Sequence, residues 1–343
     1  MQKLLWILLW SGAVAHGASF DCKKAATVQE KSICASPELS ALDKRMAEAY
    51  RAVLAATPPP FTAEVREDQR AWLRKQSLAC KSSENDPPAL SECLSASLIS
   101  RTDDLQKRIQ RVNGMTFSWR SVNLTSPKGP YVPGEIDGDD EKGSLSASWP
   151  QTADNTPEWA AWNAAMAAAT KQMASMGDEK SNPNWNEQMA EGVDVDVTTE
   201  IHIVNDRLVT VTILNNWDGH GAHPNWASME LNWLLREKRE LRADDVFRAG
   251  SDWDRRVQTI CDHALRKQLD DDYENWLKPG EVAKTLHSII LRPANWKLNG
   301  EGLSIVFQDY SVAPHVAHPD PVTIPWTDIK AYLNPQFVIP SEQ

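Results

Sequence analysis

Two pairs of histidines are the residues of this chain whose type and spacing could bind a metal ion. His220 and His223 form one His-x-x-His pair, and His315 and His318 form another. Four imidazoles could bind zinc or another divalent ion if the two loops meet in the fold. However, no carboxylate can be assigned to orient the rings, and loop histidines also serve as ordinary polar turn residues. We therefore expect no metal and no cofactor, which zinc analysis of the purified protein would test.

The acidic and nucleophilic residues form no catalytic pattern. The sequence contains no nucleophile elbow, zinc-protease helix or phosphate-binding loop. Adjacent carboxylates such as Asp244 and Asp245 point in different directions, which is poor geometry for the paired acids of a glycosidase. We therefore expect no catalytic residues and a protein that is not an enzyme.

Four cysteines, Cys22, Cys34, Cys80 and Cys93, flank helical patterns near the N-terminus. They permit three pairings, and sequence alone does not choose between them. We favour Cys22 with Cys34 and Cys80 with Cys93, because both pairs close short loops beside a helix end. Each bond would stabilise the fold by roughly 3 kcal/mol. Zinc is the competing use of cysteines, but no two of these four have zinc-site spacing. We interpret Cys261 as a buried free thiol.

The first 17 residues have the organisation of a secretory signal peptide. Lys3 precedes the apolar residues 4–10, and small residues at Ala15 and Gly17 provide cleavage positions. The apolar stretch is shorter than the roughly 20 residues that span a bilayer. Cys22 also lacks the small and apolar residues expected before a lipidated cysteine. We expect a periplasmic or secreted protein with no membrane anchor in its mature form.

The charge balance bears on the choice of partner. The 343 residues include 36 Lys and Arg against 47 Asp and Glu, a net charge of −11 with neutral histidines. Loss of residues 1–17 removes one basic residue, which leaves the mature chain near −12. An acidic surface disfavours nucleic acid and anionic membranes and attracts basic proteins, although acidity also simply keeps an exported protein soluble.

Three helical patterns accompany the cysteines. Ser36 and Pro37 are a typical helix start, and the pattern that follows ends at the prolines from Pro58. Two further patterns cover about residues 62–80 and 88–112, where apolar residues recur at helical spacing. Three helices of this size bury only a modest core, for which cross-links compensate. We expect a disulfide-stapled three-helix module at residues 18–112.

Several spaced motifs of this module agree in order with one family. They are Ser19-Phe20-Asp21-Cys22, Glu30-Lys31-x-Ile33-Cys34, Leu39-x-x-Leu42-Asp43, Tyr50, Gln69-Arg70-x-Trp72-Leu73 and Cys80. Residues 18–112 thereby resemble the LprI-type lysozyme-inhibitor N-terminal domain. The resemblance implies an exported protein associated with inhibition of lysozyme. The matching residues have a structural character, and we expect Tyr50 and Trp72 in the core.

Residues 113–343 carry a different, mixed pattern. Strands are expected at about residues 116–124 and 144–149, and an amphipathic helix at 158–176. Alternating apolar residues from Val193 to Ile213, interrupted at Asn205 and Asp206, predict a β-hairpin. A strand at 229–235, a helix at 251–269 and strands at 303–310 and 322–324 follow. We expect an α+β fold, in which this domain has an antiparallel sheet packed by helices.

A second resemblance rests on three motifs of this half. They are Gly221-Ala222-His223-Pro224-Asn225, Leu241-x-x-Asp244-Asp245-Val246-Phe247, and Phe307-x-x-Tyr310-x-Val312-Ala313-Pro314 followed by Val322-x-Ile324-Pro325. Residues 115–335 thereby resemble the C-terminal extracytoplasmic domain of the anti-sigma factor RsiV. There the domain is a receptor for lysozyme, so the resemblance implies a lysozyme partner again. His315 and His318 depart from the family pattern, which has an aromatic residue and a glycine.

The two resemblances and the acidic charge favour an exported, periplasmic protein that binds and inhibits a lysozyme, which is a strongly basic enzyme. We expect the contacts in loops. The candidate contact residues are Asp218, His220, His223 and Asn225, together with Glu135, Asp137, Asp139 and Asp140 of an acidic loop. That acidic loop departs from EF-hand spacing, so we interpret it as solvated and not as a calcium site.

The alternative function is a peptidoglycan- or carbohydrate-binding module that acts in envelope maintenance. The chain has 15 tryptophans, and exposed indoles stack on sugar rings. Trp162 and Trp253 lie on apolar helical faces, where core packing is the simpler interpretation. The tryptophans that are less obviously buried are Trp185, Trp217, Trp226 and Trp296. A virulence or toxin-immunity factor with another basic partner is a third hypothesis.

Overall fold

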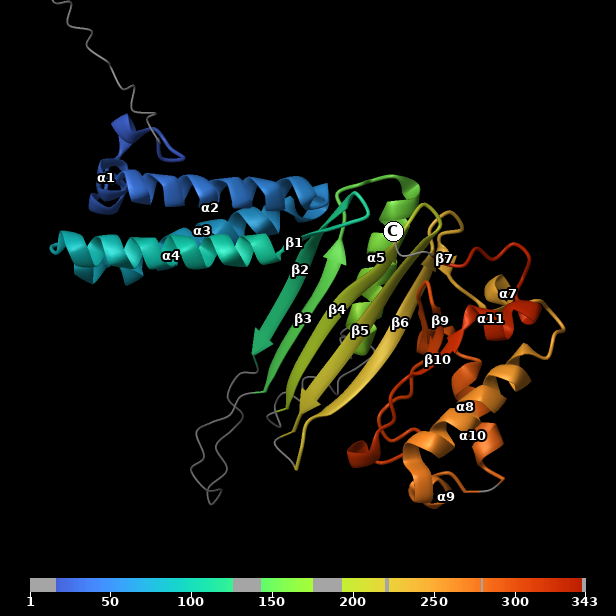
Figure 1. Cartoon of the computed structure of the whole chain (residues 1–343). Coiled ribbons are helices and arrows are strands. Elements are labelled where there is room, and N and C mark those ends of the chain that lie inside the picture. The colour runs from blue at the N-terminus through green and yellow to red at the C-terminus, as the bar shows by residue number, and fades with distance from the viewer. Residues whose placement is uncertain (1–16, 126–142, 175–192, 220–221, 279, 341–343) are drawn as a thin grey trace, which may run out of the picture. The chain divides into compact units, whose positions relative to one another are not determined.

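The structure, a computed structural model, describes residues 17–125, 143–174, 193–219, 222–278 and 280–340 (Figure 1). The chain divides into two compact units between Ile109 and Gln110. The N-terminal unit has one hydrophobic core and the C-terminal unit has two clusters of buried residues. Each unit is described by itself.

The N-terminal unit is helical. Its elements are η1 (Cys22–Lys24), α1 (Val28–Ala35), α2 (Pro37–Ala56), η2 (Pro59–Phe61), α3 (Thr62–Ala79), η3 (Lys81–Ser83) and α4 (Pro87–Lys107). The three predicted helices are present, and α1 adds a short fourth one. The expectation that the last helix continues to about residue 112 is wrong, because it ends at Lys107 and Ile109–Val112 form a strand. A capping box of Thr27 and Glu30 starts α1, and Ser36 caps α2. These caps satisfy free amide groups, which lets an eight-residue helix form where apolar periodicity is weak.

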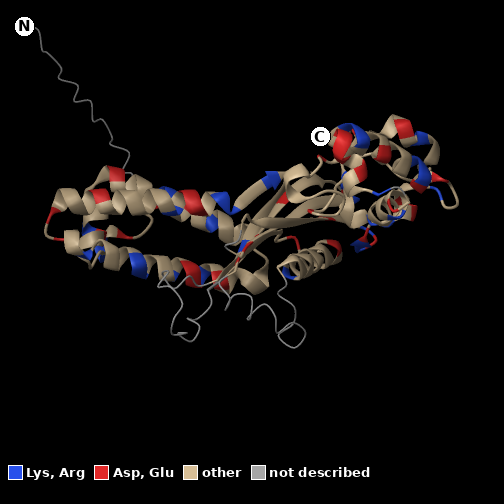
Figure 2. Ribbon diagram, turned by 90° about the horizontal axis from the view of Figure 1, so that it is seen from below, with Lys and Arg blue, Asp and Glu red and all other residues tan. Residues whose placement is uncertain are grey.

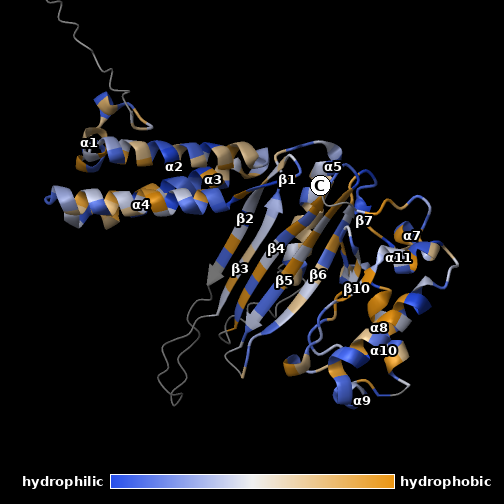
Figure 3. Cartoon of the chain, viewed as in Figure 1, coloured by the Kyte–Doolittle hydropathy of each residue, from blue (hydrophilic) through white to orange (hydrophobic). Residues whose placement is uncertain are grey.

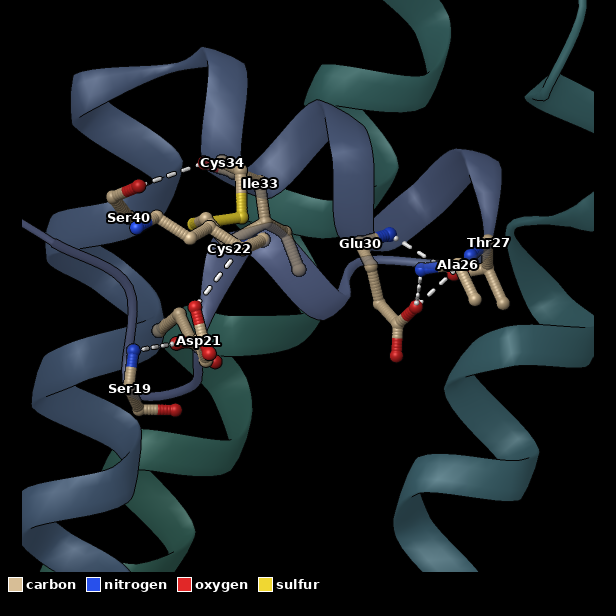
Figure 4. The surroundings of a disulfide bond; sticks show 11 residues. Ser19, Asp21, Cys22, Ala26, Thr27, Glu30, Ile33, Cys34 and Ser40 are labelled. Carbon is tan, nitrogen blue, oxygen red and sulfur yellow. Dashed lines mark hydrogen bonds between the residues drawn. A yellow bond between two sulfur atoms is a disulfide. The ribbon is translucent and has the colours of Figure 1, made fainter.

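Both disulfides lie in this unit and have the pairing that the sequence favours. Cys22 is bonded to Cys34 with Cα atoms 5.7 Å apart, and Cys80 to Cys93 with Cα atoms 5.8 Å apart. The first bond ties η1 to α1 (Figure 4), and the second ties the end of α3 to α4. The bonds therefore hold the short elements that bury little apolar surface of their own.

The helix α3 packs through polar side chains. Its buried residues are Gln69 and Gln76. The guanidinium of Arg101 on α4 donates to Gln69 Oε1 at 2.9 and 3.1 Å and to Asp68 Oδ2 at 2.7 Å. The same guanidinium lies 5.7 Å from the centre of the Trp72 ring. Because Arg101 is only 4 % exposed, paired charges and hydrogen bonds fix α3 on α4.

Among the residues that the structure describes, the C-terminal unit is built on a seven-stranded sheet of order β1 to β7. Its strands are β1 (Ile109–Val112), β2 (Met115–Thr125), β3 (Ser144–Gln151), β4 (Asp194–Val204), β5 (Leu208–Asp218), β6 (Asn225–Leu234) and β7 (Arg239–Glu240). From β2 onward neighbouring strands pair antiparallel, except that β3 and β4 are parallel. The helix α5 (Pro157–Met173) lies between these two strands in the chain, which is the kind of crossover that parallel pairing requires.

The helix α5 packs on one face of this sheet. Hydrophobic and hydrophilic residues alternate along the strands (Figure 3), as expected for a sheet with one apolar face. Phe117, Trp159 and Trp162 form a cluster of edge-to-face aromatic pairs with ring centroids 5.4 to 5.9 Å apart. Since all three are at most 7 % exposed, they anchor the helix on the sheet.

Short helices and a second sheet complete this unit. The helices are α7 (Ala243–Val246), α8 (Trp253–Leu269), α9 (Tyr273–Trp276), α10 (Val282–Ile290) and α11 (Trp326–Ile329). The strands β8 (Trp296–Leu298), β9 (Gly302–Ile305) and β10 (Val322–Pro325) form an antiparallel sheet of order β10-β9-β8. A side chain at Gly302 would meet the Ile324 carbonyl oxygen at 2.2 Å, so β9 and β10 need glycine there.

Tryptophan burial follows these elements. Trp296 is fully buried, and its indole donates to the carbonyl of Ile290 at 2.8 Å. The expectation that Trp296 is less buried is therefore wrong, because β8 places it in the core. Trp217 and Trp226 are partly buried, whereas Trp185 lies outside the described residues. Cys261 is a buried free thiol, as predicted, and burial raises its pKa to about 12.

Charged residues of both signs are interspersed along the helices of the N-terminal unit (Figure 2). Within the described ranges, none of the helices is both long and apolar enough to cross a bilayer.

Candidate partner-binding site

Two loops of the C-terminal unit meet at the histidines that the sequence singles out. His223 precedes β6, and His315 follows β9 and lies in the turn η6 (His315–Ala317). Their imidazole rings stack, with centroids 4.1 Å apart and planes 8° apart. The Tyr310 hydroxyl lies 3.2 Å from His223 Nε2. Residues from the two separate motifs therefore form one cluster.

A glutamine fixes the second loop against the sheet. The amide of Ser228 on β6 donates to Gln308 Oε1 at 2.8 Å. Gln308 Nε2 in turn lies 3.4 Å from Asn295 Oδ1, beside β8. Ser228 is the register partner of Leu214 on β5, which lies on one side of β6. On the opposite side of β6, the Gln308 side chain accepts the Ser228 amide hydrogen, as the backbone of a neighbouring strand would. The loop that carries Tyr310 and His315 is thus anchored to the same strand that follows His223.

A buried carboxylate orients one of the stacked rings. The Asp309 side chain is 3 % exposed, and its Oδ2 accepts from His315 Nδ1 at 2.7 Å. Asp309 Oδ1 and His318 Nδ1 are buried without a hydrogen-bond partner. The His318 ring packs edge-on against Trp226, with centroids 4.6 Å apart, and burial lowers the pKa of His318. Hence His318 is neutral near pH 7, while Asp309 favours a proton on His315 Nδ1.

The described cluster does not have the geometry of a metal centre. The rings of His223 and His315 are stacked, so their nitrogen atoms do not converge on one point. His223 Nδ1 lies 2.9 Å from the Pro224 carbonyl oxygen, and His315 Nδ1 bonds Asp309. Among the residues that the structure describes, no group of three or more His, Cys, Asp or Glu side chains could hold a metal ion. His220, the fourth histidine of the sequence pattern, lies outside them.

The predicted contact residues that are described lie at one end of the sheet. Asp218 ends β5, Asn225 starts β6 as the register partner of Trp217, and His223 lies in the loop between these strands. All three are partly exposed. The remaining predicted contacts, which lie outside the described residues, are His220, Glu135, Asp137, Asp139 and Asp140.

Asp309 and Tyr310 join the site although the sequence assigns them no role in it. The expectation of a strand over 303–310 is wrong in its second half, because β9 ends at Ile305 and these residues lie in the loop that follows. Tyr310 is part of the motif that resembles the RsiV domain, but a motif position alone does not say what its side chain contacts. Tyr310 has φ +59, and 56 % of it is exposed. A left-handed backbone at a tyrosine is the one local signal of a special position, and it becomes visible only in the structure.

A second polar cluster joins neighbouring strands of the large sheet. The Thr212 hydroxyl on β5 donates to the Glu230 carboxyl on β6 at 2.8 Å, and His202 Nε2 on β4 lies 2.6 Å from the same hydroxyl oxygen. Burial raises the pKa of Glu230 to about 7 and lowers that of His202. Since the hydroxyl donates to Glu230, Nε2 of His202 is its hydrogen-bond donor.

The fold and site define a class: a disulfide-stapled helical domain followed by an α+β domain with a polar and aromatic loop cluster. Two family models match these parts. Residues 22–105 match the family described as "Lysozyme inhibitor LprI", and residues 244–327 match "Protein of unknown function (DUF3298)". The chain therefore contains one region that matches the LprI family model and a second region that matches the DUF3298 model. The LprI match confirms the first resemblance, and the second match includes the loop with Asp309, Tyr310 and His315.

Two solved structures of DUF3298 family proteins are similar to this chain. A DUF3298 family protein from Pseudomonas aeruginosa PAO1 is 15% identical with a TM-score of 0.47, covering 65% of this chain and 95% of that one. A DUF3298 member from Bacteroides fragilis NCTC 9343 is 16% identical with a TM-score of 0.44, covering 66% and 96%. A search of proteins with curated descriptions gives no match.

The LprI match and the disulfides indicate the compartment in which the protein is found, and the LprI match also indicates whether it is an enzyme. Disulfide bonds persist in oxidising compartments, and a lysozyme inhibitor meets its target outside the cytoplasm. Both observations indicate an extracytoplasmic protein. An inhibitor domain also fits a protein that is not an enzyme.

Proposed function

We propose that this chain is an exported, periplasmic protein that binds a lysozyme and inhibits it. One observation carries the proposal: residues 22–105, which include both disulfides, match the family described as lysozyme inhibitor LprI. The bonds keep this small helical domain folded in the compartment where lysozyme acts.

Electrostatics supports the same partner. The chain has a net charge of −11, and a lysozyme is a basic protein. Opposite net charges raise the rate of encounter and disfavour partners of the same sign. Complementary charge is not specific for lysozyme, so it supports the family match and does not replace it.

We propose the loop cluster of the C-terminal unit as a contact surface. Asp218, His223 and Asn225 lie at one end of the sheet. The surface is extended by His315, whose ring stacks on His223, and by Tyr310, whose hydroxyl lies 3.2 Å from His223 Nε2. Aromatic side chains that are held in place lose little conformational freedom on binding, which favours them as contact residues. The proposed surface also includes His220 and the acidic residues Glu135, Asp137, Asp139 and Asp140, which lie outside the described residues.

The proposed organisation of the chain follows the sequence analysis. Residues 1–17 are a signal peptide, residues 18–112 are the LprI-like domain, and residues 113–343 are the RsiV-like domain. Mass spectrometry of protein purified from the periplasm tests the cleavage, since a mature chain that begins at His16 or Ala18 is expected. A chain that keeps Lys3 would contradict it.

Binding is tested by calorimetric titration of the mature protein with purified lysozymes. We expect a saturable complex that weakens as salt rises, because charge complementarity contributes to binding. A basic protein unrelated to lysozyme, such as a cytochrome c, serves as the control for charge alone. Equal binding of lysozyme and the control, or binding of neither, would contradict the proposal.

A further inference from the structure

A pocket of about 300 Å³ lies on the C-terminal unit, beside the loop cluster. Trp276, at the end of α9, and Tyr310 are among its lining residues. The volume is at the lower end of the range for small-molecule sites, which runs from about 300 to 1,000 Å³. The pocket is thus large enough for one or two rings.

Both aromatic side chains are unusually exposed. Trp276 is 47 % exposed and Tyr310 is 56 % exposed, although most described tryptophans of this unit pack in its cores. Single exposed apolar residues are common, but exposed apolar residues that gather at one place mark binding sites, and these two rings line the same pocket. A binding function accounts for the exposure of both rings.

The backbone holds Tyr310 in place at a cost. Its φ of +59 is in the left-handed region, which costs a residue with a side chain roughly 1–2 kcal/mol. The amide of Ser311 donates to the Gln308 carbonyl at 3.0 Å, which closes the turn around Tyr310. The turn fixes the backbone of Tyr310, and the contact of its hydroxyl with His223 Nε2 at 3.2 Å holds the far end of the side chain.

Tyr273 holds the helix α9 against α8. This residue is 2 % exposed, its hydroxyl bonds Asp262 on α8, and the guanidinium of Arg266 lies 4.2 Å from its ring centre. Leu277, directly after Trp276, is also buried. Buried neighbours on both sides keep Trp276 at the pocket although its own ring is exposed.

The rest of the lining divides into an apolar floor and a polar rim. Val312 and Ala313 are at most 5 % exposed and join Leu277 as apolar lining. Lys278 and Glu281 are exposed and supply a hydrogen-bond donor and an acceptor. Aromatic walls, an apolar floor and a mixed polar rim together select a ligand that has flat apolar faces and many hydrogen-bonding groups.

We propose that this pocket binds a short oligosaccharide of N-acetylated hexosamines. The C–H face of a pyranose ring is flat and apolar and suits Trp276 and Tyr310. An acetamido group combines a methyl group for the apolar floor with an N–H donor and a carbonyl acceptor for Glu281 and Lys278. This activity goes beyond lysozyme inhibition and does not depend on it.

The test is titration of the whole mature protein with chitotetraose, followed by calorimetry and by tryptophan fluorescence, with no lysozyme present. We expect saturable binding, and a loss of affinity of about tenfold in both Trp276→Ala and Tyr310→Ala. Leu291→Ala removes an equally exposed apolar side chain outside the pocket, 44 % exposed, and should bind like the wild type.

Maltotetraose, which has no acetamido group, is the matched sugar and should bind at least about tenfold more weakly. The proposal is overturned if chitotetraose shows no saturable binding, if Trp276→Ala binds it as the wild type does, or if the two sugars bind equally. Because lysozyme is absent from the titration, each of these results leaves the inhibition of lysozyme as a separate question.

Discussion

The imidazoles of His223 and His315 stack in parallel with centroids 4.1 Å apart, although they belong to loops from different parts of the chain. Each ring has its own support, since His223 lies beside the Tyr310 hydroxyl and His315 bonds the buried Asp309. The stack therefore joins two sequence motifs into one surface. Both ring nitrogens of His223 and Nδ1 of His315 lie at hydrogen-bond distance from protein oxygens.

His223→Ala tests whether this surface contacts lysozyme. Loss of one ring of the stack should weaken inhibition by about three- to tenfold, because contact residues at the centre of a surface contribute most. The inhibition constant against lysozyme is the measurement, with circular dichroism to verify the fold. His263→Ala, an exposed histidine on α8, is the matched control and should inhibit like the wild type. Equal inhibition by both variants would remove His223 from the contact surface.

Glu230 gives the stability of the fold a defined pH dependence. Its pKa of about 7 in the folded protein exceeds its ordinary value of 4.5, so the folded state binds the proton more tightly than the unfolded state. The resulting stabilisation is complete below about pH 4.5 and is lost as the pH rises through about 7. Its size is of the order of 3 kcal/mol.

Glu230→Gln removes this titration and keeps a side chain of similar size. We expect the unfolding free energy of the wild type to fall by about 3 kcal/mol relative to that of the variant between pH 4.5 and 7.5. Burial lowers the pKa of His202 in the folded protein, so protonation of this residue destabilises the fold as the pH falls below about 6.5. This effect is present in both the wild type and the variant. Urea unfolding at several pH values measures the difference, and a constant difference would contradict the burial of an ionisable Glu230.

Thiol counting tests the cysteine assignment. The chain has 5 cysteines, of which four form disulfides and Cys261 is buried with a pKa raised to about 12. The native protein should show no fast reaction with a thiol reagent at pH 8, because almost no thiolate is present or accessible. Unfolding without reductant should expose one thiol per chain. A count of three or five would mean that a disulfide is absent.

The second disulfide should contribute strongly to the helical unit. Replacing both Cys80 and Cys93 by serine should lower its unfolding free energy by about 3 kcal/mol, since the bond closes a loop of separation 13. Cys261→Ala, in the C-terminal unit, should leave the transition of the helical unit unchanged. Unfolding followed by far-UV circular dichroism measures the stability of both variants. A double variant as stable as the wild type would show that the Cys80–Cys93 bond does not stabilise the helical unit.

Local patterns predict much of the fold. The three longer helices and the hairpin of β4 and β5 follow from periodicity and turn residues. The disulfide pairing that short loops favour is the one present, although sequence alone leaves three pairings open. The parallel pairing of β3 with β4 is not predicted, because pairing depends on where the intervening helix crosses. Trp296 is misjudged for a related reason, since a three-residue strand shows no burial pattern of its own.

The site is predicted only in part. Its histidines stand out by type and spacing, and the condition that the two loops meet is fulfilled by His223 and His315. Asp309 and Tyr310 carry no such signal, because the bond to His315 and the left-handed backbone are features of the folded loop, which Gln308 attaches to β6. Contacts between distant segments are a property of the fold and not of either segment.

The most direct test of the central claim is lysozyme turnover on purified cell walls in the presence of the mature protein. We predict that lysis falls in a dose-dependent manner and stops once the protein exceeds a sensitive lysozyme, and that the His263→Ala variant inhibits equally well. Undiminished lysis by several lysozyme types, with folded protein in large excess, would contradict the proposed function.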